Sequence, residues 1–326
     1  MAVGVAISIA LLLWSMRGVS VHQVWREIRA AHAAPLTLAV VLATLAFPLR
    51  LIRWRLLLPR DNGRAYPAGP LWHAVALGFM ANNILPLRAG ELIRSYTASR
   101  LAKIRFTTVL SSVAVERIFD GLTLVGLLSA ALLYSDLPGN LTVGGASVAR
   151  LTKFAGLVGC LGLLGGILVL AAPRPTERLV RRMISRAQVA DRIVGLLEDV
   201  RQGLTVLRSP GRLAGVVFWS LVLWNVNALA FYVAFAAFDI GVSYWGALLM
   251  QGLLVLGISI PSTPGFFGPF EAVIVAVLAL YGVPNDLAFS YAISYHLTSF
   301  APITLLGLWS LTQTPGGLRR VSEPVT

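Results

Sequence analysis

Charged residues and cysteines are scarce in this sequence of 326 residues, and each scarcity excludes a class of protein. Only 13% of the residues are charged, whereas 57% are hydrophobic, a composition that a soluble domain of this length does not have. The single cysteine, Cys160, excludes an intramolecular disulfide and most cysteine metal sites. The composition therefore predicts an all-α polytopic membrane protein.

The short motifs that mark common enzymes are also missing. The sequence contains no H-E-x-x-H, no G-x-S-x-G, no Walker loop and no C-x-x-C, and its four histidines are scattered. We therefore expect no enzyme activity, no metal and no other cofactor. Without a Walker loop, any transport would be passive or driven by an ion or proton gradient.

Basic residues, in contrast, outnumber acidic residues by 27 to 14. In a membrane protein this excess indicates basic loops on the cytoplasmic side that contact anionic lipid headgroups, rather than binding of nucleic acid. The most basic segment has apolar residues at three- and four-residue steps, which predicts a cytoplasmic amphipathic helix over about 174–211. By the same rule both termini are cytoplasmic, and we expect the bacterial inner membrane. The segment Arg17–Ala33 is then an outside loop, although its three arginines oppose the rule.

Apolar runs predict about six full transmembrane helices within one membrane domain, 1–326. They are Ala2–Met16, Leu36–Leu58, Thr107–Leu133, Leu151–Ala172, Leu213–Phe238 and Leu287–Leu311.

Two further apolar segments, about 71–103 and 245–281, are interrupted by proline, glycine and polar residues. Each arm has about 15 residues, roughly 23 Å at 1.5 Å per residue, which is short for a hydrocarbon core of ~30 Å. The flanking charges place the ends of the two segments on opposite sides. We therefore predict two oppositely oriented re-entrant helical hairpins, as in inverted-repeat transporters. The alternative is eight to ten ordinary spans.

The first interruption carries two asparagines, Pro86, Arg88, Gly90 and Glu91 within ten residues. Pro86 removes a backbone donor and ends the incoming helix, and Gly90 lets the chain turn. The freed backbone groups must be buried in protein or line a wet cavity. Ionisable groups at membrane depth mark a substrate path by default. The alternative is a cytosolic turn.

The span after this interruption contains Glu116 and Asp120, four residues apart on one helix face and close to the membrane midplane. They need a cationic partner, and Arg88 or Arg94 is the nearest candidate. A structural salt bridge is as compatible with this pattern as a direct contact with substrate.

Other polar residues at membrane depth have simpler interpretations. Glu271, where a helix begins after the second interruption, is either a helix cap or part of the path. His296 is either a packing residue or a proton relay. Arg50, Arg53 and Arg55 are expected to snorkel to the cytoplasmic headgroups.

Three motifs in order resemble the lysylphosphatidylglycerol synthase transmembrane (flippase-like) family over essentially the whole chain. They are Asn82-Asn83-x-Leu85-Pro86-x-Arg88-x-Gly90-Glu91-x-x-Arg94, Glu116-Arg117-x-x-Asp120, and Pro261-x-x-Pro264-Gly265-x-x-Gly268-x-x-Glu271. The resemblance implies a membrane domain that moves lipids between leaflets. Stand-alone relatives are associated with aminoacyl-phospholipids, polyprenyl-linked sugars and hopanoids. In some members the domain is joined to a cytosolic aminoacyl-lipid synthase; this sequence lacks that half, so we do not expect aminoacylation.

We therefore predict a lipid translocator, with membrane lipids of anionic or hydroxylated headgroup and enzymes of lipid synthesis as candidate partners. The alternatives are a membrane-embedded transferase acting on lipid-linked substrates and a non-transporting scaffold of a lipid-synthesis complex. The predicted substrate-path residues are Asn82, Asn83, Pro86, Arg88, Gly90, Glu91, Arg94, Glu116, Arg117, Asp120, Pro264, Gly265, Gly268, Glu271 and His296.

Overall fold

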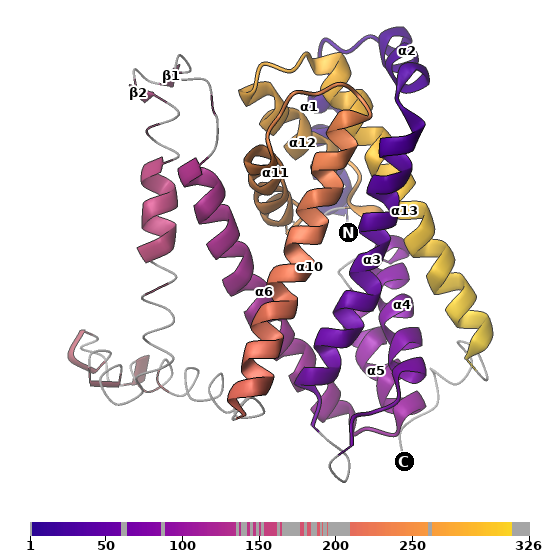
Figure 1. The fold of residues 1–326 in the computed structure, drawn as a ribbon, viewed down its shortest axis with the longest axis vertical. Coiled ribbons are helices and arrows are strands. Elements are labelled where there is room, and N and C mark those ends of the chain that lie inside the picture. Colours follow the sequence, from indigo (N-terminus) through magenta and orange to yellow (C-terminus); the bar gives the residue numbers. More distant parts are fainter. Residues whose placement is uncertain are drawn as a thin grey trace.

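A computed structural model describes residues 2–59, 64–85, 89–134, 209–259 and 263–314, with short stretches between them (137, 142–143, 146–147, 150, 153–161, 164, 177–178, 181–183, 188–189, 191 and 194). Helices dominate these residues (Figure 1). The strands that they contain, β1 (Thr142–Val143) and β2 (Ala146–Ser147), form one small antiparallel pair. The predicted class, an all-α polytopic membrane protein, is confirmed.

Long helices run through the molecule at four of the predicted spans. By length and composition, α3 (Ala33–Leu57), α6 (Phe106–Tyr134) and α10 (Pro210–Ala236) can each cross a membrane, and α13 (Asn285–Gln313) has 29 residues. Helices α3 and α10 pack along each other (Figure 1). Most of the predicted span 151–172 and of the predicted amphipathic helix 174–211 lies outside the described residues.

The amino-terminal helix has nearly the bounds that the sequence predicts. Helix α1 (Ala2–Ser15) has 14 residues, about 21 Å at 1.5 Å per residue, and its first end lies near mid-height in Figure 1. It packs against α12 and ends within one residue of the predicted span Ala2–Met16, whereas its crossing of a membrane stays a prediction.

The segment Arg17–Ala33, expected to be a loop, contains helix α2 (Val21–Ala30). The Ser20 side chain accepts a hydrogen bond from the Gln23 amide, and the Ser20 amide donates to Asp286 of α13 at 2.7 Å. A serine cap and an apolar contact of Val24 with the core stabilise this short amphipathic helix. The predicted loop thus contains a short helix, because capping and docking on α13 outweigh the polar composition, whereas its outside position stays a prediction.

The first predicted hairpin consists of α4 (Ala68–Ile84) and α5 (Gly90–Ala102). Their backbones approach so closely at Gly78 and Gly90 that a Cβ on either glycine would collide with the backbone of the other. The Asn82 side-chain oxygen accepts a hydrogen bond from the Gly90 amide at 2.9 Å. The polar residues of this interruption thus hold the chain where it reverses.

The second predicted hairpin consists of α11 (Tyr244–Gly257), the short 3₁₀ turn η3 (Pro264–Phe266) and α12 (Pro269–Leu280). Gly265 and Gly268 have φ angles of 72° and 96°, a region that favours glycine. In Figure 1, α4 and α5 lie in the lower half and α11 and α12 in the upper half, and α4 contacts η3. This arrangement agrees with two oppositely placed hairpins, whereas their re-entrant position in a membrane stays a prediction.

Candidate functional site

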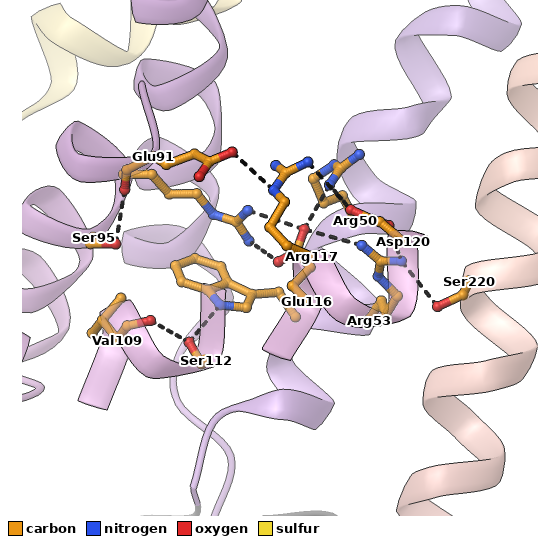
Figure 2. Close-up of polar contacts among 12 residues, drawn as sticks. Arg50, Arg53, Glu91, Ser95, Val109, Ser112, Glu116, Arg117, Asp120 and Ser220 are labelled. Atoms are coloured by element: carbon orange, nitrogen blue, oxygen red, sulfur yellow. Dashed lines mark hydrogen bonds and ion pairs between the residues drawn. The ribbon is translucent and has the colours of Figure 1, made fainter. Parts of the chain in front are cut away.

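Five charged side chains from three helices meet in the interior of the molecule, next to the first hairpin (Figure 2). None of these side chains is more than 8% exposed. They are Arg50 and Arg53 of α3, Arg94 of α5, and Glu116 and Asp120 of α6. We call these five residues the arginine–carboxylate cluster.

Glu116 is the centre of this cluster because all three arginines donate to it. Its Oε1 accepts from Arg50 at 2.6 Å, from Arg53 at 3.1 Å and from Arg94 at 3.2 Å. Its Oε2 accepts from the second guanidinium nitrogen of Arg94 at 2.8 Å. Arg94 therefore makes a two-pronged contact, which is the strong geometry for an arginine and a carboxylate.

Asp120 connects the cluster to the fourth helix, α10. Its Oδ1 accepts from Arg53 at 2.6 Å and from the Trp224 indole at 3.1 Å, and its Oδ2 accepts from Arg50 at 3.3 Å. Arg53 also donates to the Ser220 hydroxyl of α10 at 3.0 Å (Figure 2). Four helices are thus joined by one hydrogen-bonded network.

Helix periodicity explains why these residues converge. Glu116 and Asp120 are four apart, and Arg50 and Arg53 are three apart, so each pair shares a helix face. The Arg94 guanidinium lies 3.8 Å above the ring of Trp54, a cation–π contact. The Trp54 indole donates to Ser112 of α6 at 3.0 Å, so its ring is held in place.

The structure corrects one prediction here and confirms another. Arg50 and Arg53 do not snorkel to the surface but are 7% and 0% exposed and bind the carboxylates of α6. Arg55, at the end of the same helix, donates to the Tyr66 carbonyl at 3.1 Å. Arg94 is a partner of Glu116, as predicted. Arg88, the other candidate, and Pro86 lie outside the described residues.

Within the described residues, the charges of the cluster do not balance. Three guanidinium groups face two carboxylates, so one positive charge is in excess. The Nε–H groups of Arg50, Arg53 and Arg94 are buried and have no hydrogen-bond partner in the described part of the chain. Buried charge without a partner is strongly unfavourable, so this excess favours an anion as a further ligand.

A partly exposed ion pair borders the cluster. Arg117 of α6 and Glu91 of α5 lie 2.9 Å apart, with side chains 42% and 35% exposed. Arg117 is also 3.5 Å from Asp120. The pair therefore extends the buried network to the partly exposed edge of the hairpin. Because it consists of one cation and one anion, it leaves the net charge of the network unchanged.

The asparagines of the first interruption have structural contacts. Asn82 holds Gly90, as described above, and Asn83 donates to the Thr304 hydroxyl of α13 at 3.1 Å. These contacts close the hairpin and attach it to the last helix.

Residues of the second interruption form a separate group around Glu271 and His296. Glu271 Oε2 accepts from the Gly268 amide at 2.7 Å, which confirms the predicted cap of α12. Its Oε1 lies 2.6 Å from Nδ1 of His296, and Nε2 of His296 lies 2.9 Å from the Gly265 carbonyl oxygen. Pro264 begins η3. Both side chains of the pair are buried, with Glu271 0% and His296 4% exposed.

The described residues of the predicted path therefore fall into two groups, one at each interruption. Among the described residues, no hydrogen bond or ion pair joins the two, although α4 contacts both α5 and η3. A common cavity stays a prediction.

Sequence reasoning did not identify Arg50, Arg53, Ser220 or Trp224 as members of the first cluster. The signal in the sequence was the spacing, since Arg50 and Arg53 lie three apart and Ser220 and Trp224 four apart within apolar runs.

Together, the apolar helices, the two interrupted hairpins and the buried charges define a helical membrane protein with an ionised interior, a class that includes transporters. The chain belongs to the family described as the lysylphosphatidylglycerol synthase TM region, whose profile matches residues 1–307. The resemblance inferred from the three motifs is confirmed.

Curated relatives carry two kinds of name. Glycosyltransferase AglD of Haloferax volcanii is 28% identical over 305 residues, which cover 85% of this chain and 48% of that protein. This chain thus spans about half the length of that relative. Two proteins of Methanothermobacter thermautotrophicus named UPF0104 membrane protein are each 25% identical. The matches cover 84% and 94% of this chain, and 81% and 90% of those proteins.

Proposed function

We propose that this protein is a lipid translocator of the bacterial inner membrane, which moves a lipid with an anionic headgroup between leaflets without changing it chemically. The observation that carries the proposal is the excess positive charge of the arginine–carboxylate cluster. An anionic group beside the cluster would offset this charge, and the three Nε–H groups without a partner among the described residues would supply donors.

The position of the cluster supports transport rather than surface binding. It lies between the first hairpin and three long apolar helices, in the interior of a membrane domain. The Glu91–Arg117 pair at its edge is partly exposed, so a headgroup can approach the buried charges from the hairpin side. Paired interrupted helices near the centre of the fold are the usual place for a substrate site in transporters.

Charge also narrows the candidate lipids. Aminoacyl-phospholipids and polyprenyl phosphate-linked sugars both contain phosphate, which arginine binds well. Hopanoids have no phosphate in their ring system. Their apolar rings suit the apolar surroundings, but they offer no anion to the excess positive charge. We place the α3–α4 and α5–α6 junctions on the cytoplasmic side, where the positive-inside rule puts their arginines.

Two other functions are tested by the same experiment. The name of the Haloferax relative, a glycosyltransferase, favours the alternative of a membrane-embedded transferase. We propose that this chain is not an enzyme, because its buried carboxylates are held by arginines and helix-capping contacts. A scaffold of a lipid-synthesis complex would neither exchange nor alter a lipid.

The test is leaflet exchange in liposomes that contain the purified full chain. A fluorescent phosphatidylglycerol and a phosphatidylcholine with the same chains serve as anionic and zwitterionic probes. We expect the anionic probe to exchange at least about tenfold faster, equivalent to about 1.4 kcal/mol of selectivity. Its mass should be unchanged on recovery.

Arg94→Gln is the informative variant, because it leaves two guanidinium groups facing two carboxylates and removes the excess charge. We expect it to abolish the preference for the anionic probe, whereas Arg94→Lys keeps the charge and most of the preference. Arg181→Gln, whose side chain is 48% exposed and pairs with Glu177 and Asp191, is the control for an arginine outside the cluster. Equal exchange of both probes by the native protein would contradict anion selection. A chemically altered probe without exchange would support the transferase.

A further inference from the structure

The Glu271–His296 pair has a hydrogen-bonding requirement that the lipid site does not explain. The Gly265 carbonyl can only accept, so Nε2 of His296, 2.9 Å away, must carry a proton. Nδ1 of the same ring lies 2.6 Å from a carboxyl oxygen of Glu271. Two lone pairs would repel at this distance, so a second proton lies between these atoms.

The pair therefore holds one proton more than a neutral histidine beside an ionised glutamate. That proton belongs either to the ring, giving imidazolium and carboxylate, or to Glu271, giving neutral imidazole and carboxylic acid. In both forms the pair is neutral overall. Its neutrality suits its burial, because an isolated buried charge is strongly unfavourable.

Loss of this proton has a structural consequence. A neutral imidazole has a single N–H, which can serve either the carboxylate or the Gly265 carbonyl, but not both. The ionised carboxylate is the stronger acceptor, so the ring keeps Glu271 and gives up Gly265. The contact that is lost is the one between α13 and η3, at the interruption of the second hairpin.

Among the described residues, aromatic side chains surround the pair. Phe270 stacks on the His296 ring with centroids 4.0 Å apart, and Phe267 lies 4.5 Å away. Helices α1 and α11 have no charged residue, and Glu271 is the only one in α12.

Several charged or titratable groups on the other packed helices have contacts of their own. Asp286 of α13 accepts from Ser20, and His73 of α4 lies against Trp309. On α2, Glu27 accepts from Gln23 and Arg29 lies over Trp25. Arg50 and Arg53 of α3 bind Glu116 and Asp120.

We propose that Glu271 and His296 form a proton-binding site that latches η3 onto α13, and that proton release opens this latch during lipid movement. The latch follows from the pair itself, whereas its coupling to lipid movement rests on the proposed translocator function. One proton passes to solvent on release and one returns on closure, with no other bond broken. A proton gradient across the membrane is then the energy source that the chain can use in place of ATP.

Glu271→Gln is the matched variant because its amide imitates the protonated pair. Its NH₂ donates to Nδ1 of His296 and its carbonyl accepts from the Gly268 amide, so both native contacts are retained by a side chain that does not ionise. Asp286→Asn is the control. It also replaces a carboxylate with an amide, but at a side chain of α13 that accepts from the Ser20 amide and does not contact the pair.

The latch is tested without lipid transport by hydrogen exchange of the amides of residues 265–268 between about pH 5 and pH 9. After correction for the intrinsic pH dependence, we expect protection in the native protein to fall at least about tenfold as the pH rises. Glu271→Gln should keep constant protection, and Asp286→Asn should behave like the native protein. The same pH dependence in Glu271→Gln and the native protein would overturn the proton latch.

Coupling is tested in liposomes with an imposed pH difference. We expect the native protein to accumulate the phosphatidylglycerol probe in one leaflet, and Glu271→Gln not to respond to the pH difference. Exchange by the native protein that ignores the pH difference would overturn the coupling while leaving translocation intact. Absence of exchange under all conditions, with the pH-dependent protection retained, would reject the translocator and leave the latch in place.

Discussion

The two buried polar clusters satisfy their charges in opposite ways. The arginine–carboxylate cluster consists of groups that stay ionised, because guanidinium does not lose its proton in proteins, and it ends with one positive charge in excess. The Glu271–His296 pair is neutral because it shares a proton. A fixed charge suits the attraction of an anion, whereas a shared proton suits a contact that opens and closes.

The clusters also differ in how much structure depends on them. The first joins α3, α5, α6 and α10 through hydrogen bonds between residues far apart in the sequence. The second joins η3, α12 and α13 around one ring. We therefore expect neutralisation of a carboxylate to destabilise the protein far more in the first cluster than in the second.

Glu116→Gln should have the largest effect. It leaves three buried guanidinium groups facing Asp120 alone, and removing one partner of a buried ion pair typically destabilises by about 3–5 kcal/mol. Thermal unfolding in detergent, followed by helical circular dichroism, measures the loss. The matched change Glu271→Gln should lower the stability by no more than about 1 kcal/mol, because the amide keeps both hydrogen bonds. Equal losses in the two variants would erase the difference between the clusters.

The double variant Glu116→Gln with Arg94→Gln sharpens the comparison. Arg94 donates both of its terminal nitrogens to Glu116, so the second change removes a cation that the first has left without its partner. We expect the double variant to be more stable than the sum of the single losses predicts, by about 1–3 kcal/mol. Strictly additive losses would mean that the two side chains do not interact.

Arg117→Gln should have the smallest effect. Its side chain is 42% exposed and its pair with Glu91 is screened by solvent, so we expect a loss of about 0–1 kcal/mol. The loss should shrink further at high salt, whereas that of Glu116→Gln should not. A large, salt-independent loss would place Arg117 among the buried charges.

The sequence by itself determined the class of the protein and the positions of most described helices. Length of an apolar run and the presence of proline or glycine act locally, so they marked α3, α6, α10 and α13 and both interruptions within a few residues. The motifs around Glu116 and Glu271 also sufficed for the family, which the match over residues 1–307 confirms. Helix α2 was missed because its capping and its contact with α13 are not visible in an apolar pattern.

Only the tertiary structure decided which charges meet. Arg50 and Glu116 are separated by 66 residues, and Glu271 and His296 by 25. Because Arg50 and Arg53 lie near the end of an apolar run, the sequence alone predicts that their side chains extend to the lipid headgroups. They bind Glu116 and Asp120 instead, because α3 packs along α10 and contacts α6, which brings the carboxylates within hydrogen-bonding distance. A residue's helix depends on its neighbours in the chain, whereas its ionic partner depends on how helices distant in the sequence cross.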